Sequence, residues 1–278
     1  MKELQADPHL PADLVALVAE VAQRQLAVEA VARYRAPDPA ALARPEAHAQ
    51  GAPLHPREDF RPDLAQAGEL FRDILDLACE VAGPLGRAAR AFRAEHWAGF
   101  RLEHAALAHS LGNEDWFREW EGRTPEAPRL VAFLTRSALA PALAAEARSL
   151  RALVHAGAWS HGCCPVCGSL PLISSLRGKT GERWAVCSHC ATEYRTPRLG
   201  CVFCGESDPA RLAFYDVPEE PGYRIDTCAT CGLYVKTADF RTLDKISVPL
   251  LDDLESLAMD LVAARHNFRR PTLSGWGF

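Results

Sequence analysis

Long apolar runs are missing from this sequence of 278 residues, because Glu, Arg, Asp or Gln interrupts every helical stretch before about 20 residues have passed. We therefore expect no membrane span. The first residues, MKELQADPHLPADL, lack an apolar segment after the charges, so we also expect no secretory leader. Basic residues are not in excess either, since 31 Lys and Arg stand against 36 Asp and Glu, a formal net charge of −5. These absences predict a cytoplasmic protein and argue weakly against a nucleic-acid ligand.

Cysteine is almost absent outside one segment. Nine of the ten cysteines lie between Cys163 and Cys231, and only Cys79 lies elsewhere. Because a reducing cytoplasm disfavours disulfides, clustered cysteines there are expected to be metal ligands or redox-active groups. Cys79 has no second cysteine nearby in the sequence, so we expect it to be a packed core thiol.

The first half of the chain has the periodicity of helices. Apolar residues recur at three- and four-residue spacing from Pro11 to Tyr34, whereas six prolines between Pro37 and Pro62 predict an extended connection on the domain surface. We expect Gly83-Pro84 to end the helix that follows this connection. The further helices are predicted at about 62–82, 86–111, 114–121 and 129–155. Residues 1–158 are therefore predicted to form an all-α domain.

The second half has short β-prone runs with paired cysteines, followed by one more helix. Ser247-Val248-Pro249 is typical of a helix start, and the pattern continues to about Phe268. The predicted fold class is α+β, with a hinge near His155 to His161. The predicted parts after the helical domain are two metal modules, 159–199 and 200–245, and a C-terminal helix and tail, 246–278.

Four CxxC pairs lie within this half: Cys164 and Cys167, Cys187 and Cys190, Cys201 and Cys204, Cys228 and Cys231. Two intervening residues let a tight turn direct both thiolates at one point, and a following glycine adopts the left-handed conformation such a turn needs. Two facing turns form a tetrahedral S₄ site. Ala191 replaces the glycine after the second pair, which costs up to about 1–2 kcal/mol if its φ is positive.

The loop lengths predict how the pairs combine. Nineteen residues separate Cys167 from Cys187 and 23 separate Cys204 from Cys228, whereas only ten separate Cys190 from Cys201. Each long loop suits a β-hairpin, so pairs one and two are assigned to one metal and pairs three and four to another. GERW before Cys187 resembles GYRI before Cys228, which indicates a tandem duplication of rubredoxin-like or zinc-ribbon modules.

Metal binding is expected to hold these modules folded, because about 30 residues bury too little core alone while a structural site contributes roughly 10–16 kcal/mol. Eight cysteines fill two sites, so a hydrolytic site with an open position is disfavoured. A dithiol oxidoreductase would need CxxC at a helix start, but these pairs precede hairpins. His189 and Cys163 are alternative ligands, and Cys164 is favoured over Cys163 because it has CxxC spacing to Cys167.

A nucleic-acid-binding zinc ribbon is the competing interpretation of the motif. Between Cys164 and Cys231 there are seven Lys or Arg and eight Asp or Glu. Eight thiolates with two divalent ions add a further charge of −4 (−8 + 4). The module is therefore acidic, opposite to the charge that a phosphate backbone requires.

The segments CPVCGSLP, GERWAVCSHC, TEYRTPRLGCVFCG and CATCGLYVKT closely resemble the FdhE family of formate dehydrogenase accessory proteins. The resemblance implies a cytoplasmic, non-enzymatic maturation factor that binds the catalytic subunit of respiratory formate dehydrogenase before its export. It also implies iron in two rubredoxin-like centres, with zinc able to replace it. The ligands it implies are Cys164, Cys167, Cys187, Cys190, Cys201, Cys204, Cys228 and Cys231.

Two other functions stay open at this point. Iron in an S₄ site changes its charge by one electron, so an electron-transfer or redox-sensing protein is the first alternative. A zinc-ribbon nucleic-acid-binding regulator is the second. We expect a protein partner and no nucleic acid, with a homodimer as an open possibility.

Overall fold

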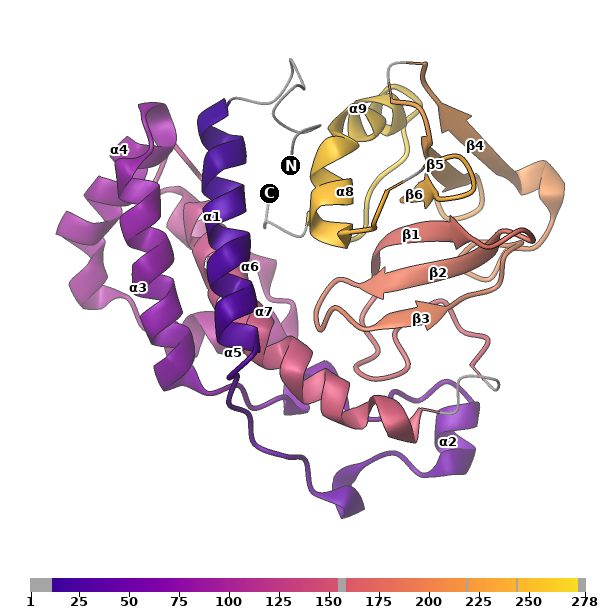
Figure 1. The fold of residues 1–278 in the computed structure, drawn as a ribbon, viewed down its shortest axis with the longest axis horizontal. Helices are drawn as coiled ribbons and strands as arrows, with labels where there is room; N and C mark the ends of the chain where they lie inside the picture. The colour runs from indigo at the N-terminus through magenta and orange to yellow at the C-terminus, as the bar shows by residue number, and fades with distance from the viewer. Residues whose placement is uncertain (1–11, 155–158, 219, 244, 275–278) are drawn as a thin grey trace. The chain divides into compact units, whose positions relative to one another are not determined.

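The computed structural model describes residues 12–154, 159–218, 220–243 and 245–274. Within these ranges, residues 12–36 and 57–146 form one compact unit, and residues 37–56 and 147–274 form a second. Each unit is described by itself below, with the element labels of Figure 1. The hinge predicted near His155 to His161 lies partly outside the described residues, because 155–158 are not among them.

The first unit is helical, as the periodicity predicts. Its elements are α1 (Ala12–Glu29), α3 (Leu64–Glu80), α4 (Gly83–Ala91), α5 (Leu102–Leu111), α6 (Glu114–Glu121) and the first part of α7 (Leu130–Leu150). Four aromatic side chains pack at its centre: Phe71 stacks on Phe100 at 5.0 Å, and Trp120 meets both Phe100 and Phe92 edge-on. Cys79 is buried in α3, as expected of a core thiol.

Helix α3 ends at Glu80, just before Gly83-Pro84, as predicted. The next helix begins earlier than the predicted residue 86, because Gly83-Pro84 form the first turn of α4, where the missing N–H of proline is not needed. The single helix predicted over 86–111 is interrupted by a π-helical turn, Phe92–His96, and a 3₁₀ turn, Trp97–Gly99. This interruption lets Phe100 leave the helix and join the aromatic core.

One helical stretch, Leu130–Leu153, is apolar and long enough to span a membrane by length and composition. The expectation that charges exclude every such stretch was too strict. However, 83% of its apolar window is buried inside the protein, as in the core helix of a globular domain.

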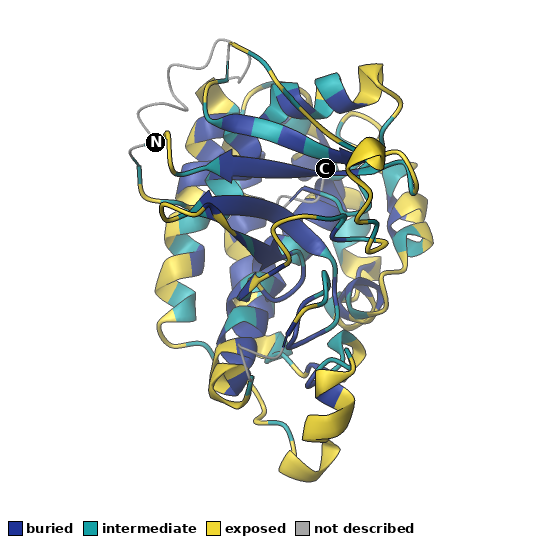
Figure 2. Ribbon diagram, turned by 90° about the vertical axis from the view of Figure 1, so that its right-hand side faces the viewer, coloured by how far each residue is buried: buried dark blue, intermediate teal, exposed yellow. Residues whose placement is uncertain are grey.

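The second unit contains one six-stranded sheet. Its strands are β1 (Pro171–Arg177), β2 (Glu182–Cys187), β3 (Glu193–Arg195), β4 (Leu212–Asp216), β5 (Tyr223–Cys228) and β6 (Leu233–Asp239). The strand order is β3-β2-β1-β6-β5-β4, and the central strands are buried along nearly their whole length (Figure 2). Each predicted module contributes three antiparallel strands, and a parallel pairing of β1 with β6 joins the two modules. The sequence predicts the hairpins but not this shared sheet.

Two short helices pack against one face of the sheet, α8 (Pro249–Glu255) and α9 (Leu257–Arg265). The single C-terminal helix predicted from the sequence is therefore wrong. Ser256 separates the two helices, because its hydroxyl donates to the carbonyl of Asp252 at 2.7 Å, while Lys236 Nζ donates to the carbonyl of Asp253 at 2.6 Å. These carbonyls are bound by side chains at the point where the helix breaks.

The proline-rich connection contains short helical turns, including α2 (Pro45–Ala49), and it packs with the sheet unit. The amides of Leu54 and His55 donate to the carbonyls of Pro165 and Val166, at 2.9 and 2.8 Å. This connection therefore lies against the turn that carries the first cysteine pair. Proline spacing alone does not indicate that placement.

Candidate metal centres

Cluster 1 consists of Cys164, Cys167, Cys187 and Cys190, all of them buried. The first pair lies in the turn before β1, and the second pair begins at the end of β2. The four sulfurs lie within 4.8 Å of one another, with Cys164 Sγ 3.7 Å from Cys190 Sγ and Cys167 Sγ 3.3 Å from Cys187 Sγ. The antiparallel β1–β2 hairpin brings these two turns together.

Cluster 2 repeats this arrangement with Cys201, Cys204, Cys228 and Cys231. The β4–β5 hairpin connects its two pairs. Cys201 Sγ lies 3.7 Å from Cys231 Sγ, and Cys204 Sγ lies 3.7 Å from Cys228 Sγ. The structure thus groups the eight cysteines in the same two sets that the loop lengths predict.

The turn after each cysteine pair has a positive φ. The φ angles are 77° at Gly168, 75° at Gly205 and 70° at Gly232, and Ala191 has a φ of 54° at the equivalent place. This turn directs backbone N–H groups at sulfur: His189 N lies 3.4 Å from Cys187 Sγ, and Phe203 N lies 3.4 Å from Cys201 Sγ. Hydrogen bonds of this kind stabilise a thiolate and orient it as a ligand.

The geometry of the sulfurs suits a tetrahedral cation site. A metal–sulfur bond of about 2.3 Å places neighbouring sulfurs of a tetrahedron about 3.8 Å apart, close to the sulfur separations in both clusters. Burial raises the pKa of the Cys164 and Cys187 thiols well above their ordinary value. Four thiolates at such a buried point therefore need a cation to remain ionised. The donor set fits zinc or iron equally well.

The two clusters differ in their exposure to solvent. All four cysteines of cluster 1 are buried, with exposures of 0% at Cys164 and 2% at each of the other three. In cluster 2 only Cys228 is buried, Cys201 and Cys231 are partly exposed, and Cys204 is exposed. Solvent and small reagents therefore reach cluster 2 more easily than cluster 1.

The alternative ligands lie outside the two sulfur clusters. Cys163 is partly exposed, and its carbonyl accepts a hydrogen bond from Trp159 Nε1 at 2.9 Å. Cys164, its neighbour, belongs to cluster 1. His189 is buried within the second cysteine turn but is not one of the four clustered ligands.

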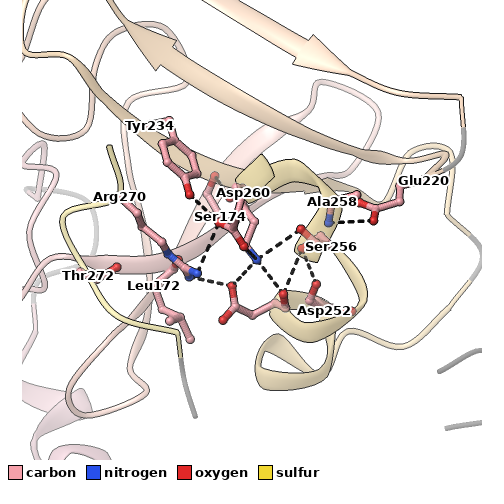
Figure 3. Close-up of polar contacts among 12 residues, drawn as sticks. Leu172, Ser174, Glu220, Tyr234, Asp252, Ser256, Ala258, Asp260, Arg270 and Thr272 are labelled. Atoms are coloured by element: carbon pink, nitrogen blue, oxygen red, sulfur yellow. Dashed lines mark hydrogen bonds and ion pairs between the residues drawn. The ribbon is translucent and has the colours of Figure 1, made fainter. Parts of the chain in front are cut away.

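A buried charge network between β6 and the helices α8 and α9 was not predicted from the sequence (Figure 3). Lys236 has no exposed surface, and its Nζ lies 2.8 Å from carboxylate oxygens of both Asp253 and Asp260. Arg270 Nη2 lies 2.6 Å from Asp253 Oδ1. Lys236 follows three apolar residues in β6, Leu233 to Val235, so only its position opposite α8 and α9 could have indicated this role.

Comparisons with known proteins agree on one family. Residues 163–198 match a family model described as FdhE, central domain. The Aquifex aeolicus "Protein FdhE homolog" is 35% identical over 113 residues, which cover 40% of each chain. A protein of the same name from Pseudomonas aeruginosa is 36% identical over 120 residues, covering 40% of this chain and 38% of the relative. The matching segment thus spans about two fifths of the length of these curated relatives.

A solved structure extends the similarity to almost the whole chain. The crystal structure of the FdhE protein from Pseudomonas aeruginosa matches with a TM-score of 0.69 and 25% sequence identity. The alignment covers 99% of this chain and 91% of the other. These comparisons confirm the resemblance to the FdhE family.

Proposed function

From the resemblance to the FdhE family, we propose that this chain is an accessory protein in the maturation of formate dehydrogenase. The structural similarity over 99% of the chain carries this proposal, because it includes the helical unit as well as the cysteine-rich one. In this function the protein binds the catalytic subunit of the dehydrogenase in the cytoplasm, before that subunit is exported. It catalyses no reaction of its own.

Each cysteine cluster holds one metal ion in this proposal. The ligands are Cys164, Cys167, Cys187 and Cys190 in cluster 1, and Cys201, Cys204, Cys228 and Cys231 in cluster 2. Four thiolates leave no position for water or substrate, so the ions hold the turns together instead of activating a nucleophile. We assign iron to both clusters, as the family resemblance implies, with zinc as the ion that could replace it.

Deletion of the gene tests the proposed function. We expect a deletion strain grown under formate-respiring conditions to lose formate dehydrogenase activity, and the wild-type gene to restore it. The paired variant Cys164→Ser with Cys167→Ser should not restore activity, whereas Cys79→Ser, outside both clusters, should. Full dehydrogenase activity in the deletion strain would contradict the proposal.

Electron transfer is the second candidate function, and the exposure of Cys204 favours it because an exposed ligand shortens the path to a redox partner. Iron supplies one-electron chemistry in such a site. Replacement of iron by zinc separates the two functions. If zinc-loaded protein supports dehydrogenase maturation as well as iron-loaded protein does, electron transfer is excluded and client binding is sufficient.

A further inference from the structure

Strand β4 lies at one end of the sheet and pairs only with β5 among the described residues. Ala229 N donates to Arg211 O at 2.8 Å, so these opposed residues form a hydrogen-bonded pair. In an antiparallel ladder every second pair is of this kind, so Ala213 and Tyr215 direct their backbone groups toward β5. Phe214 and Asp216 fall at the positions whose backbone N–H and C=O groups point away from β5. A further strand can therefore pair with this edge.

The other end of the sheet is different. Strand β3 has only three residues, Glu193–Arg195, and charged side chains stand at both ends of it. Those side chains form ion pairs, Glu193 with Arg177 at 2.6 Å and Arg195 with Glu182 at 3.2 Å. Short length and charge are the usual protection of a sheet edge against pairing. Strand β4 is longer, with the sequence LAFYD, and only its last residue, Asp216, is charged, so its edge has less of that protection.

A hollow of about 190 Å³ adjoins β4 on one face of the sheet. Its walls are β4, β5 and the segment from Arg198 to Phe203 that leads into cluster 2. Two apolar side chains of its lining are unusually exposed, Leu199 at 82% and Phe214 at 59%. Exposed apolar side chains that lie together at a weakly protected sheet edge are typical of a surface that a partner covers.

Three arginines and one acidic residue line the same hollow: Arg183, Arg198, Arg224 and Asp226. Their formal charges sum to +2 (3 − 1). Arg183 and Arg224 both pair with Asp226, so that one carboxylate is shared by two guanidinium groups. Arg224 also lies over the ring of Phe214, 4.9 Å from its centroid, and so reaches from β5 toward the edge strand.

We propose that β4 and this hollow bind an extended peptide segment of a client protein, in which apolar and acidic side chains alternate along one face. The segment adds a strand to the sheet through the backbone of Phe214 and Asp216. Its apolar side chains cover Phe214 and Leu199, and its acidic side chains meet Arg198 and Arg224. The choice of a peptide as partner rests on the proposed function in one respect, namely that the protein binds a polypeptide client.

Fluorescence anisotropy with the full-length, metal-loaded protein tests the proposal. The probe is a fluorescein-labelled peptide, Thr-Leu-Thr-Glu-Thr-Leu-Thr-Glu-Thr, and the comparison peptide has lysine in place of each glutamate. We expect the glutamate peptide to bind at least about tenfold more tightly than the lysine peptide. Equal affinity of the two peptides, or no binding of either at millimolar concentration, would overturn the proposal.

Matched variants locate the site. Phe214→Ala removes the ring, and Phe214→Pro also removes the outward N–H without breaking a hydrogen bond to β5. We expect Phe214→Ala and Arg224→Gln each to raise Kd by about tenfold or more, and Phe214→Pro to raise it further. Leu261→Ala, at an exposed apolar position on α9, and Lys179→Gln, in the β1–β2 turn, should leave Kd unchanged.

Metal content and far-ultraviolet circular dichroism check that each variant is folded. If Phe214→Ala and Arg224→Gln fold but bind the glutamate peptide like wild type, the proposed surface is wrong. The peptide measurement does not involve formate dehydrogenase, so a failure of this surface can be distinguished from a failure of the proposed function. A second experiment asks whether the formate dehydrogenase catalytic subunit co-purifies with each protein. If the subunit co-purifies with both variants as it does with wild type, this surface alone is wrong. If it does not co-purify with wild type, the result counts against the proposed function.

Discussion

Lys236 Nζ lies 2.8 Å from Asp253 Oδ1, and both side chains are withdrawn from water, with exposures of 0% and 1%. This ion pair joins β6 to α8. Removal of both charges from water has a large desolvation cost, which is offset only when every partner is in place. Here Asp260 and Arg270 complete a set of two cations and two anions (Figure 3). The network therefore fixes the position of the C-terminal helices on the sheet.

Loss of Lys236 should destabilise the second unit. Lys236→Met fills a similar volume but leaves Arg270 as the one remaining cation beside the buried carboxylate of Asp253. We expect a loss of about 3–5 kcal/mol in the free energy of unfolding, measured by urea denaturation of the metal-loaded protein. Lys179→Met, at an exposed turn, should change it by less than about 0.5 kcal/mol. Equal stability of the two variants would show that the network does not hold the helices.

Stability should fall in acid because of Asp253. Burial opposes ionisation of its carboxyl, but Lys236 and Arg270 outweigh burial and hold its pKa below the ordinary value of 3.8. The stabilisation is therefore complete above about pH 4 and is lost as pH falls through the lowered pKa. Asp253→Asn should reduce stability at neutral pH and flatten its decline below about pH 4. Urea denaturation across that range measures both effects, and an unchanged slope would contradict this assignment.

Replacement of Ala191 should stabilise cluster 1. Its φ of 54° is strained for alanine but not for glycine. Because glycine also loses more backbone entropy on folding, we expect Ala191→Gly to raise the free energy of unfolding by only about 0.5–1 kcal/mol. Ala210→Gly, in a 3₁₀ turn without positive φ, should lower it instead. Destabilisation by both substitutions in urea denaturation would show that Ala191 is unstrained.

Metal should leave cluster 2 first. Cys204 is exposed, whereas all four ligands of cluster 1 are buried. We expect a chelator added to zinc-loaded protein to remove one ion in a fast phase and the second in a slow phase, as measured by a colorimetric zinc indicator. Cys201→Ser with Cys204→Ser should abolish the fast phase only, and Cys79→Ser should alter neither. A single phase for both ions would contradict the asymmetry.

Local spacing was sufficient to predict much of the cysteine-rich half. The loop lengths around Cys187 and Cys228 determine which turns a hairpin can bring together, so the grouping of the sulfurs follows from the sequence. The left-handed conformation expected of the glycine after a CxxC pair is also present at Ala191, for which the sequence left the sign of φ open. These features depend on contacts within one hairpin.

Features that depend on contacts between distant segments could not be predicted. The parallel pairing of β1 with β6 joins strands from two modules, and neither strand's pattern identifies its neighbour. Likewise, Lys236 is recognisable as a buried cation only when Asp253 and Asp260 are placed beside it. The break at Ser256 depends on the same lysine. The start of α4 was missed for another reason, because Gly83-Pro84 both follows the end of α3 and forms the first turn of the next helix.

Native mass spectrometry of anaerobically purified protein tests the two-centre account most directly. We predict two metal ions per chain, one for each cluster, and one ion per chain in the variant with Cys164→Ser and Cys167→Ser. A wild-type chain that carries no metal, with its cysteines as free thiols or disulfides, would contradict the account.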